Sequence, residues 1–397
     1  MSWFSGLVQN EVPFSDIKKE KGRFRTWDYE PFGYSGTGYE DYEEELTQYT
    51  SGDFNNADDA GKGGIINDIF SIYREVGIFP IKYFSQAGAY NEIVKCMNFD
   101  AKFNGDTVST GVGIGTELCN WAFPNLYDAQ STQDKSATKN NVETMIKKFN
   151  NDKYLKRAIQ FCYSYDGGKP VPGQVLAGLR MMGSAPTNFR PANASAIIKR
   201  FLPEGGTYYD FACGYGGRLL GTLMSGAGYK YVGVDPNYET MYNLHRLGSM
   251  IEDVTGLTDS FELHCVGSEE FKGPENSVDF AFSSPPYFDL EIYSDDPGQS
   301  VKKYPEIDGW LEGYVRGTVR NIRHMLKPGG YYCVNIADFT VNGKNVNFVD
   351  AWAKISEEEG LLKVDTLYLG VTARTGSKQI QSSELKKETI SVFQNRK

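Results

Sequence analysis

Short apolar segments alternate with amphipathic ones over the second half of the chain, and this alternation restricts the fold more than any other feature. Segments rich in β-branched and aromatic residues are separated by stretches of helical periodicity. Repeats of this length predict a parallel sheet covered by helices on both faces, the doubly wound α/β architecture. The predicted strands are 207–212, 230–234, 261–266, 278–283, 331–336, 361–369 and 389–393. No helix separates the last two, so we expect them to pair antiparallel. The predicted helices are 218–225, 237–253, 310–325 and 348–358, and Lys327-Pro328-Gly329-Gly330 is predicted to form a turn.

The first 169 residues lack this alternation. Residues 1–63 are rich in Tyr, Gly and acidic side chains with little periodicity, which predicts an irregular acidic arm. Short apolar segments within 64–169 favour amphipathic helices. We therefore expect three parts: the arm, a helical accessory domain over 64–169, and an α/β domain over 170–397.

The formal net charge of −10 argues against a protein that holds nucleic acid by bulk electrostatics. Most of this charge lies in one acidic run between positions 40 and 59 that contains no base. A nucleic-acid substrate therefore stays possible, with a small basic groove and salt-sensitive binding. One basic cluster at helical spacing has two interpretations, a phosphate track or a solvated helix face. Its members are Lys147, Lys148, Lys153, Lys156 and Arg157.

Several classes of protein are disfavoured by what the sequence contains. The six cysteines and three histidines are scattered, and their spacings match neither a zinc site nor a redox pair, so we expect reduced thiols and no metal. No apolar run approaches the ~20 residues of a membrane span, so we expect no membrane partner. The first residues lack the basic start and apolar centre of a secretory signal, which makes the cytoplasm the expected compartment. The sequence makes no prediction of oligomeric state.

A glycine-rich segment follows the first strand of the α/β domain. Asp210-Phe211-Ala212-Cys213-Gly214-Tyr215-Gly216-Gly217 leads directly into a predicted helix. Its glycines allow the backbone to turn tightly and approach a ligand at the carboxyl edge of the sheet. Leu219 stands where a dinucleotide fingerprint has a small residue, which disfavours NAD and FAD. The next strand ends before Asp235, whose carboxylate can accept hydrogen bonds from ribose hydroxyls; a helix N-cap is the alternative.

A second segment, Ser283-Ser284-Pro285-Pro286-Tyr287, follows the fourth strand. Two prolines after a strand impose a stiff turn that cannot extend the ladder. The carbonyl groups of Ser284 and Pro285 are thereby left available as acceptors, and an aromatic ring follows them. Acceptors beside a ring suit a planar substrate with an exocyclic amino group, whereas the alternative is an ordinary loop break.

Together these segments resemble the S-adenosylmethionine-dependent amino-methyltransferases of DNA, which modify N4 of cytosine or N6 of adenine. The resemblance covers about 189–393, and it includes the cofactor loop placed before Ser-Pro-Pro-Tyr and a final strand at 387–393. It implies the Rossmann-like fold of class I methyltransferases, S-adenosylmethionine as cofactor, and DNA with a flipped base as partner. The cofactor-binding residues that it implies are Phe189, Arg190, Pro191, Asp210, Ala212, Gly214, Gly216, Asp235, Pro236, Ser268 and Ser284. For Ser268, capping of the next helix is the alternative.

The resemblance assigns catalysis to Ser284, Pro285, Pro286 and Tyr287. An aromatic amine is a poor nucleophile because its lone pair is delocalised into the ring. Acceptors from the Ser284 hydroxyl and the Pro285 carbonyl would hold the N–H groups and let the nitrogen pyramidalise toward the methyl-sulfonium. Tyr287 would stack on the flipped base, a contact worth ~1–3 kcal/mol. Serine is too weak a base to remove a proton first, so deprotonation would follow methyl transfer.

The resemblance implies methylation of a DNA base amine, and Ser at position 284, rather than Asp or Asn, makes it imply cytosine N4 over adenine N6. Attack at cytosine C5 is disfavoured because it needs a thiolate, and the sequence has no Pro-Cys dipeptide. No long insertion separates Tyr215 from Ser284, so target recognition is expected of residues 64–169. The loop 288–300 either closes over the base or forms plain surface. Open alternatives are an RNA or protein-glutamine methyltransferase, and a non-catalytic module that senses the cofactor and binds DNA.

Overall fold

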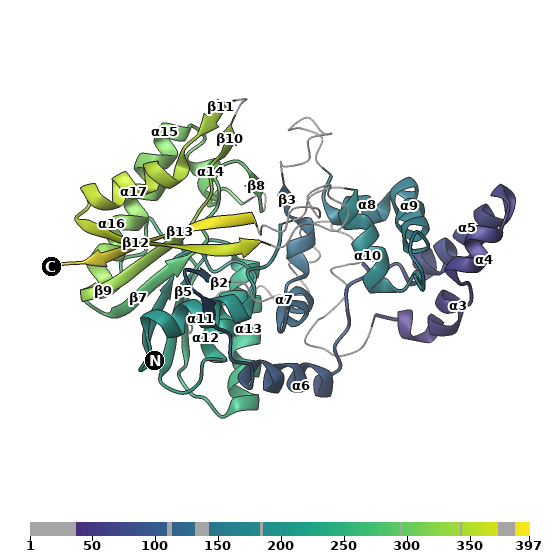
Figure 1. Cartoon of the computed structure of the whole chain (residues 1–397), viewed down its shortest axis with the longest axis horizontal. Helices are drawn as coiled ribbons and strands as arrows, with labels where there is room; N and C mark the ends of the chain where they lie inside the picture. The colour runs from purple at the N-terminus through teal and green to yellow at the C-terminus, as the bar shows by residue number, and fades with distance from the viewer. Residues whose placement is uncertain are drawn as a thin grey trace.

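The structure is a computed structural model that describes residues 37–108, 113–131, 143–182, 186–293, 296–341, 344–371 and 386–397. Figure 1 shows a sheet flanked by helices on one side of the molecule and a group of helices on the other. Between them lie α6 (Gln86–Met97), α7 (Thr116–Ala122) and the short 3-10 helix η4 (Pro124–Asp128). Within the described residues, no helix has both the length and the hydrophobicity to cross a bilayer.

Nine of the described strands form one sheet in the order β1-β2-β12-β13-β9-β7-β4-β5-β6. Strands β4 to β7 and β9 run parallel, and β13 runs antiparallel to both β9 and β12. The order winds outward from β4 in both directions, so the topological switch point lies between β4 and β7. The bounds are β1 (Phe103–Asn104), β2 (Thr107–Val108), β4 (Gly206–Asp210), β5 (Tyr229–Val234), β6 (Phe261–His264), β7 (Val278–Ser283), β9 (Leu326–Asn335), β12 (Leu361–Val371) and β13 (Lys386–Asn395). This arrangement confirms the predicted fold class, a Rossmann-like doubly wound sheet with an antiparallel terminal pair.

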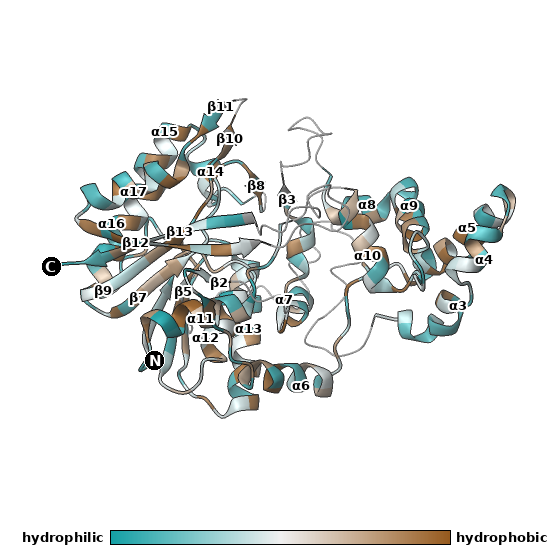
Figure 2. Cartoon of the chain, in the orientation of Figure 1, coloured by the Kyte–Doolittle hydropathy of each residue, from teal (hydrophilic) through white to brown (hydrophobic). Residues whose placement is uncertain are grey.

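Alternate side chains of the central strands enter two separate cores. Tyr208 and Phe280 pack on one face with α11 (Pro191–Phe201), α12 (Gly217–Leu223) and α13 (Tyr238–Thr255). Tyr209 and Ala281, one position further along each strand, pack on the other face. The helices there are α14 (Ser300–Lys303), α15 (Ile307–Trp310), the π-helical turn η5 (Leu311–Val315), α16 (Arg316–Met325) and α17 (Phe348–Glu358). Figure 2 shows β7 as largely hydrophobic, as a strand buried on both faces requires.

The helical lobe departs from the predicted boundaries. Its helices are η3 (Tyr39–Tyr42), α3 (Glu43–Thr47), α4 (Ser51–Asn56), α5 (Asp59–Val76), α8 (Met145–Asn150), α9 (Asp152–Cys162) and α10 (Pro172–Met181). The expectation of an irregular arm is therefore wrong for residues 39–63; residues 1–36 lie outside the described residues. Thr50 and Asp53 form a capping box, and the Asp58 side chain caps α5, so local hydrogen bonds start helices in this acidic segment. Residues 172–181, which fall in the predicted α/β domain, form α10 and pack against α9.

Residues of the predicted accessory domain also build part of the sheet. Strand β2 pairs parallel with β12, and β1 pairs with β2, so this hairpin extends one sheet edge. The Asn125 amide donates to the Thr240 hydroxyl of α13 at 3.0 Å. The N-terminal half, within residues 37–182, and the α/β half, within residues 186–397, are thus joined by backbone and side-chain hydrogen bonds.

Two predicted boundaries inside the sheet domain need correction. The helix predicted over 310–325 contains the π-helical turn η5, and the turn predicted at Lys327–Gly330 lies inside β9. Gly329 has φ 79°, and the pairing of β7 with β9 shifts register between Val278 and Phe280. The glycines therefore produce a bulge within a strand rather than a connection between elements. Two small pairs complete the fold: β10 (Phe339–Val341) with β11 (Lys344–Val346), and β3 (Gln130–Ser131) with β8 (Glu291–Ile292).

Candidate active site

The three segments singled out in the sequence meet at the carboxyl ends of β4, β5 and β7. The backbone N–H of Gly214 donates to Asp235 Oδ2 at 3.4 Å, which joins the glycine-rich loop to the end of β5. The Ser283 hydroxyl donates to the carbonyl oxygen of Ala212 at 3.2 Å, which joins the loop to the end of β7. The proline turn therefore starts directly after Ser283, a residue that is bonded to the glycine-rich loop.

Glycine is required in this loop at two positions for close approach. Gly216 has φ 79°, and a Cβ there would lie 2.6 Å from Cε2 of Phe123, which comes from the N-terminal half. A Cβ at Gly217 would lie 1.8 Å from the carbonyl oxygen of Phe189. The absence of side chains thus lets two distant segments pack against the loop.

Asp235 is half-buried at the end of β5. Besides the bond from Gly214, its Oδ1 accepts the backbone N–H of Asn237 at 2.9 Å. Burial raises the pKa of Asp235 to about 6. The N-cap of α13 is Asn237, whose side chain accepts the backbone N–H of Thr240, so Asp235 does not take the alternative role of N-cap. Pro236, next to it, is also half-buried.

Asp210 is fully buried, and both of its carboxylate oxygens have donors within the chain. Oδ2 accepts from Arg218 Nε at 2.9 Å and from the Tyr231 hydroxyl at 2.9 Å. Oδ1 accepts the backbone N–H of Ala212 at 3.3 Å. Arg218 was not predicted as a site residue, although a charged residue between Gly217 and two leucines at the start of an apolar helix is a visible signal in the sequence.

The segment before the loop contacts both the loop and β7. The Asn188 amide donates to the Tyr215 carbonyl at 2.6 Å, and the Phe189 ring lies edge-on to Phe282, 5.6 Å between centroids. Arg190 and Pro191 are the N-cap and first residue of α11. The start of α11 is therefore fixed against both the glycine-rich loop and β7.

The proline turn holds its aromatic ring in a fixed position. Ser284 and Pro286 are partly exposed, whereas Pro285 is buried. The Tyr287 hydroxyl donates to the carbonyl oxygen of Asn335 at 3.4 Å, and its ring lies edge-on to Phe339 at 5.9 Å. Burial raises the pKa of Tyr287 well above its usual value, so the phenol stays neutral.

The residue after this ring has a left-handed backbone. Phe288 has φ 47° and is buried with its ring edge-on to Trp310. This conformation is rare for a bulky side chain and costs about 1–3 kcal/mol. Packing of the Phe288 ring thus stabilises a strained corner directly after the turn.

The loop that follows contacts both halves of the protein. Its strand β8 pairs with β3 of the N-terminal half. The Tyr293 hydroxyl donates to the Glu291 carboxylate, and the Tyr293 ring lies 6.2 Å from that of Tyr215 in the glycine-rich loop. Neither contact follows from the loop's composition. Residues 294–295 of this predicted loop lie outside the described residues.

Ser268 and one lysine of the basic cluster form hydrogen bonds with other side chains of the protein. The Ser268 hydroxyl is buried and forms a 2.8 Å hydrogen bond with that of Thr318 in α16. In the basic cluster, Lys148 is buried, and Lys156 donates to Asn67 at 2.8 Å. The other three members, Lys147, Lys153 and Arg157, are exposed. No group of three or more His, Cys, Asp or Glu within the described residues is arranged to hold a metal ion.

Comparisons with known proteins give structural likeness only. No family model and no curated protein matches the chain. The cyclase SpnF aligns over 53% of this chain and 84% of its own, with 12% identity and a TM-score of 0.36. A SAM-dependent methyltransferase from Aquifex aeolicus aligns over 52% and 90%, with 18% identity and a TM-score of 0.34. A geranyl diphosphate methyltransferase in complex with SAM aligns over 56% and 89%, with 12% identity and a TM-score of 0.35.

Proposed function

We propose that this protein transfers a methyl group from S-adenosylmethionine to the exocyclic amine of a DNA base, preferring N4 of cytosine to N6 of adenine. The observation that carries the proposal is the hydrogen bond from Ser283 to Ala212, 3.2 Å long, between the proline turn and the glycine-rich loop. This bond supports the proposal because it joins the turn proposed to hold the amine to the loop proposed to hold the methyl donor, at the switch point where such sheets bind ligands.

The described residues fit this cofactor. Asp235 offers a partly exposed carboxylate at the end of β5, suited to ribose hydroxyls. At Gly214, φ is 59° and the nearest atom to an added Cβ is 3.7 Å away, which leaves the loop backbone accessible. We assign the methionine end to Phe189, Arg190 and Pro191, and the adenine to Pro236 and Ser268. The bound cofactor would supply an electrophilic methyl group on a positively charged sulfur.

The proline turn would orient the amine. The Ser284 hydroxyl and Pro285 carbonyl accept its N–H groups, so that the nitrogen lone pair points at the donor. Tyr287, held by Asn335 and Phe339, presents its ring to the base. Its neutral phenol removes no proton, which agrees with deprotonation after methyl transfer.

We further propose that the N-terminal half recognises the target. Two contacts support this role: β3 pairs with the loop after the proline turn, and Phe123 packs on Gly216. Both come from the segment 116–131, which therefore reaches the two loops that would enclose the cofactor and the base. The α/β half itself has no long insertion between these loops.

A labelling experiment tests the reaction and its substrate. The protein is incubated with methyl-labelled S-adenosylmethionine and, separately, duplex DNA, RNA or protein, and digested DNA is analysed by mass spectrometry. We expect label in N4-methylcytosine; label in N6-methyladenine would change the base, and label only in RNA or in glutamine would replace the substrate. Cofactor binding without any transfer would make the protein a binding module.

Two serine variants control this assay. Ser284→Ala removes an acceptor from the proline turn and should lower methyl transfer at least about tenfold. Ser277 lies just before the opposite end of β7, and its hydroxyl donates to the carbonyl oxygen of Pro274. Ser277→Ala should therefore leave the rate of methyl transfer unchanged.

A further inference from the structure

One buried side chain, Arg218, binds three segments around the glycine-rich loop. It lies in the first turn of α12 and is 4% exposed. Its Nε donates to Asp210 at the end of β4, and its Nη2 donates to the Ala212 carbonyl within the loop. Its guanidinium carbon lies 5.5 Å from the centroid of the Phe189 ring, in the segment before α11.

The partners of Arg218 connect it to the neighbouring strands. The Ala212 carbonyl that it binds also accepts the Ser283 hydroxyl at the end of β7. The Asp210 carboxylate that it binds also accepts the Tyr231 hydroxyl of β5. One guanidinium therefore fixes the loop relative to β4, β5 and β7 together. A guanidinium suits this position because its rigid planar fork binds both acceptors in a fixed geometry and also stacks on a ring, whereas an ammonium group has no planar face.

We propose that Arg218 is a positioning residue of the cofactor site, which sets the Ala212 carbonyl and the Phe189 ring in place, and that Asp210 neutralises Arg218 instead of binding the cofactor. The inference rests on the proposed function. It explains why an acidic residue at the start of the loop is fully buried with both oxygens occupied. Because the charges of Arg218 and Asp210 cancel, the pair would also add no net charge beside the cationic sulfonium of the cofactor.

A double substitution separates this role from a general contribution to folding. Arg218→Met alone leaves the Asp210 charge buried without its partner, which should strongly destabilise the protein. Asp210→Asn combined with Arg218→Met removes both charges, so most of the lost thermal stability should return. Cofactor affinity should not return with it, because the guanidinium contacts with the Ala212 carbonyl and the Phe189 ring are then missing.

The measurements are the midpoint of thermal unfolding and the S-adenosylmethionine dissociation constant from calorimetry, on the full chain. We expect the double variant to unfold near the wild-type temperature and to bind at least about tenfold more weakly. Equal recovery of stability and affinity would overturn the inference. If the wild type itself binds no S-adenosylmethionine, the proposed function fails first, and the two failures are thereby distinguished.

A conservative variant tests the requirement for a planar group and keeps the charge. Arg218→Lys can still pair with Asp210, so the protein should remain folded, but it should bind the cofactor about tenfold more weakly. Arg320→Lys is the matched control, because Arg320 is 65% exposed on α16 and bonds only Glu359 among the contacts described. Wild-type affinity in Arg218→Lys would contradict the proposal.

Discussion

Tyr287 makes the most direct contact that we propose with the substrate base, and its ring is held by Asn335 and Phe339 before a base enters. We expect Tyr287→Ala to lower turnover about 10- to 100-fold, the equivalent of a stacking contact of about 1–3 kcal/mol. Cofactor affinity should stay nearly intact. Steady-state kinetics and calorimetry measure the two quantities, and equal loss of both would contradict the assigned role.

Tyr287→Phe is the matched control for the ring. It keeps the aromatic surface and the contact with Phe339, and it removes the hydroxyl, which donates to the carbonyl oxygen of Asn335 at 3.4 Å. Turnover should therefore fall far less than in Tyr287→Ala. A phenylalanine variant as inactive as the alanine variant would show that the hydroxyl carries the effect.

The raised pKa of Asp235 predicts that cofactor binding depends on pH. Its pKa is about 6 because of burial, and ribose hydroxyls bond more strongly to the ionised form. Protonation therefore competes with binding, so affinity should fall as the pH drops below about 6, by up to about tenfold per pH unit. Titrations between about pH 8 and about pH 5 measure this, and Asp235→Asn should bind weakly with no such dependence.

At the scale of elements, the approach of the segment 186–190 to the start of α12 depends on the missing side chain of Gly217. We expect Gly217→Ala to lower cofactor affinity at least about tenfold, because its Cβ would lie 1.8 Å from the Phe189 carbonyl and must displace it. Gly64→Ala is the same substitution inside α5, where a Cβ meets nothing within 4 Å. It should leave affinity unchanged and raise stability by about 0.5–1 kcal/mol.

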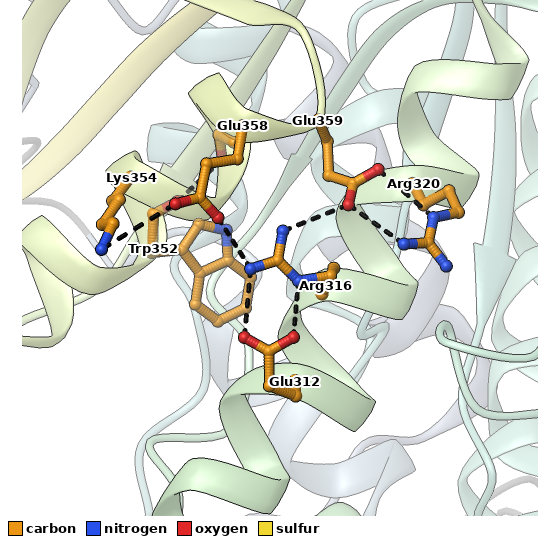
Figure 3. A network of polar contacts seen from close by, with 8 residues as sticks. Glu312, Arg316, Arg320, Trp352, Lys354, Glu358 and Glu359 are labelled. Atoms are coloured by element: carbon orange, nitrogen blue, oxygen red, sulfur yellow. Dashed lines mark hydrogen bonds and ion pairs between the residues drawn. The ribbon is translucent and has the colours of Figure 1, made fainter.

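The outer helices of the sheet domain are joined by an ionic network, which Figure 3 shows around Arg316. Arg316 of α16 contacts Glu312 at 2.7 Å, Glu358 at 2.7 Å and Glu359 at 3.2 Å, so it connects η5 to the end of α17. Glu359 also contacts Arg320 at 3.1 Å. The network lies on the helix layer and contains none of the proposed site residues.

We expect Arg316→Met to lower the free energy of unfolding by about 1 kcal/mol, and Arg320→Met, which has one acidic partner here, by less. The difference between Arg316→Met and the wild type should shrink in about 0.5 M salt, since the charges are partly exposed. Denaturant unfolding at two salt concentrations checks both expectations. A difference that persists in high salt would assign the effect to packing of the arginine stem.

At the scale of the whole molecule, the net charge of −10 limits how DNA can be held. If the proposed substrate is correct, few phosphates are neutralised, and the logarithm of affinity should fall with the logarithm of salt with a slope of about −3 or shallower. Fluorescence anisotropy with a labelled duplex measures the slope. A slope near −10 would indicate a long basic track, which the exposed Lys147, Lys153 and Arg157 alone do not supply.

Local features that depend on short-range geometry were predicted correctly from the sequence. The strand 278–283 and the helix 348–358 have the predicted bounds, because apolar alternation, prolines and flanking polar residues act within a few positions. The helices over 39–63 were not predicted, because the acidic, Tyr-rich composition indicated an irregular segment. The two helix caps at Thr50 and Asp58 are the local signals that indicated helices there. The sequence did not indicate that residues 172–181 form a helix packed on α9, because such a partner is identified only by packing.

By itself, the sequence determined the alternation of strands and helices in the second half of the chain, the glycine-rich loop and the proline turn, since each follows from the conformational limits of neighbouring residues. Only the tertiary structure decided that Arg218 occupies the Asp210 carboxylate, that Phe123 packs on Gly216, and that β3 pairs with β8. These contacts join residues far apart in the chain or select one partner among several acceptors. Their physical basis is the burial of charge and the exclusion of space in a packed interior, which no local pattern encodes.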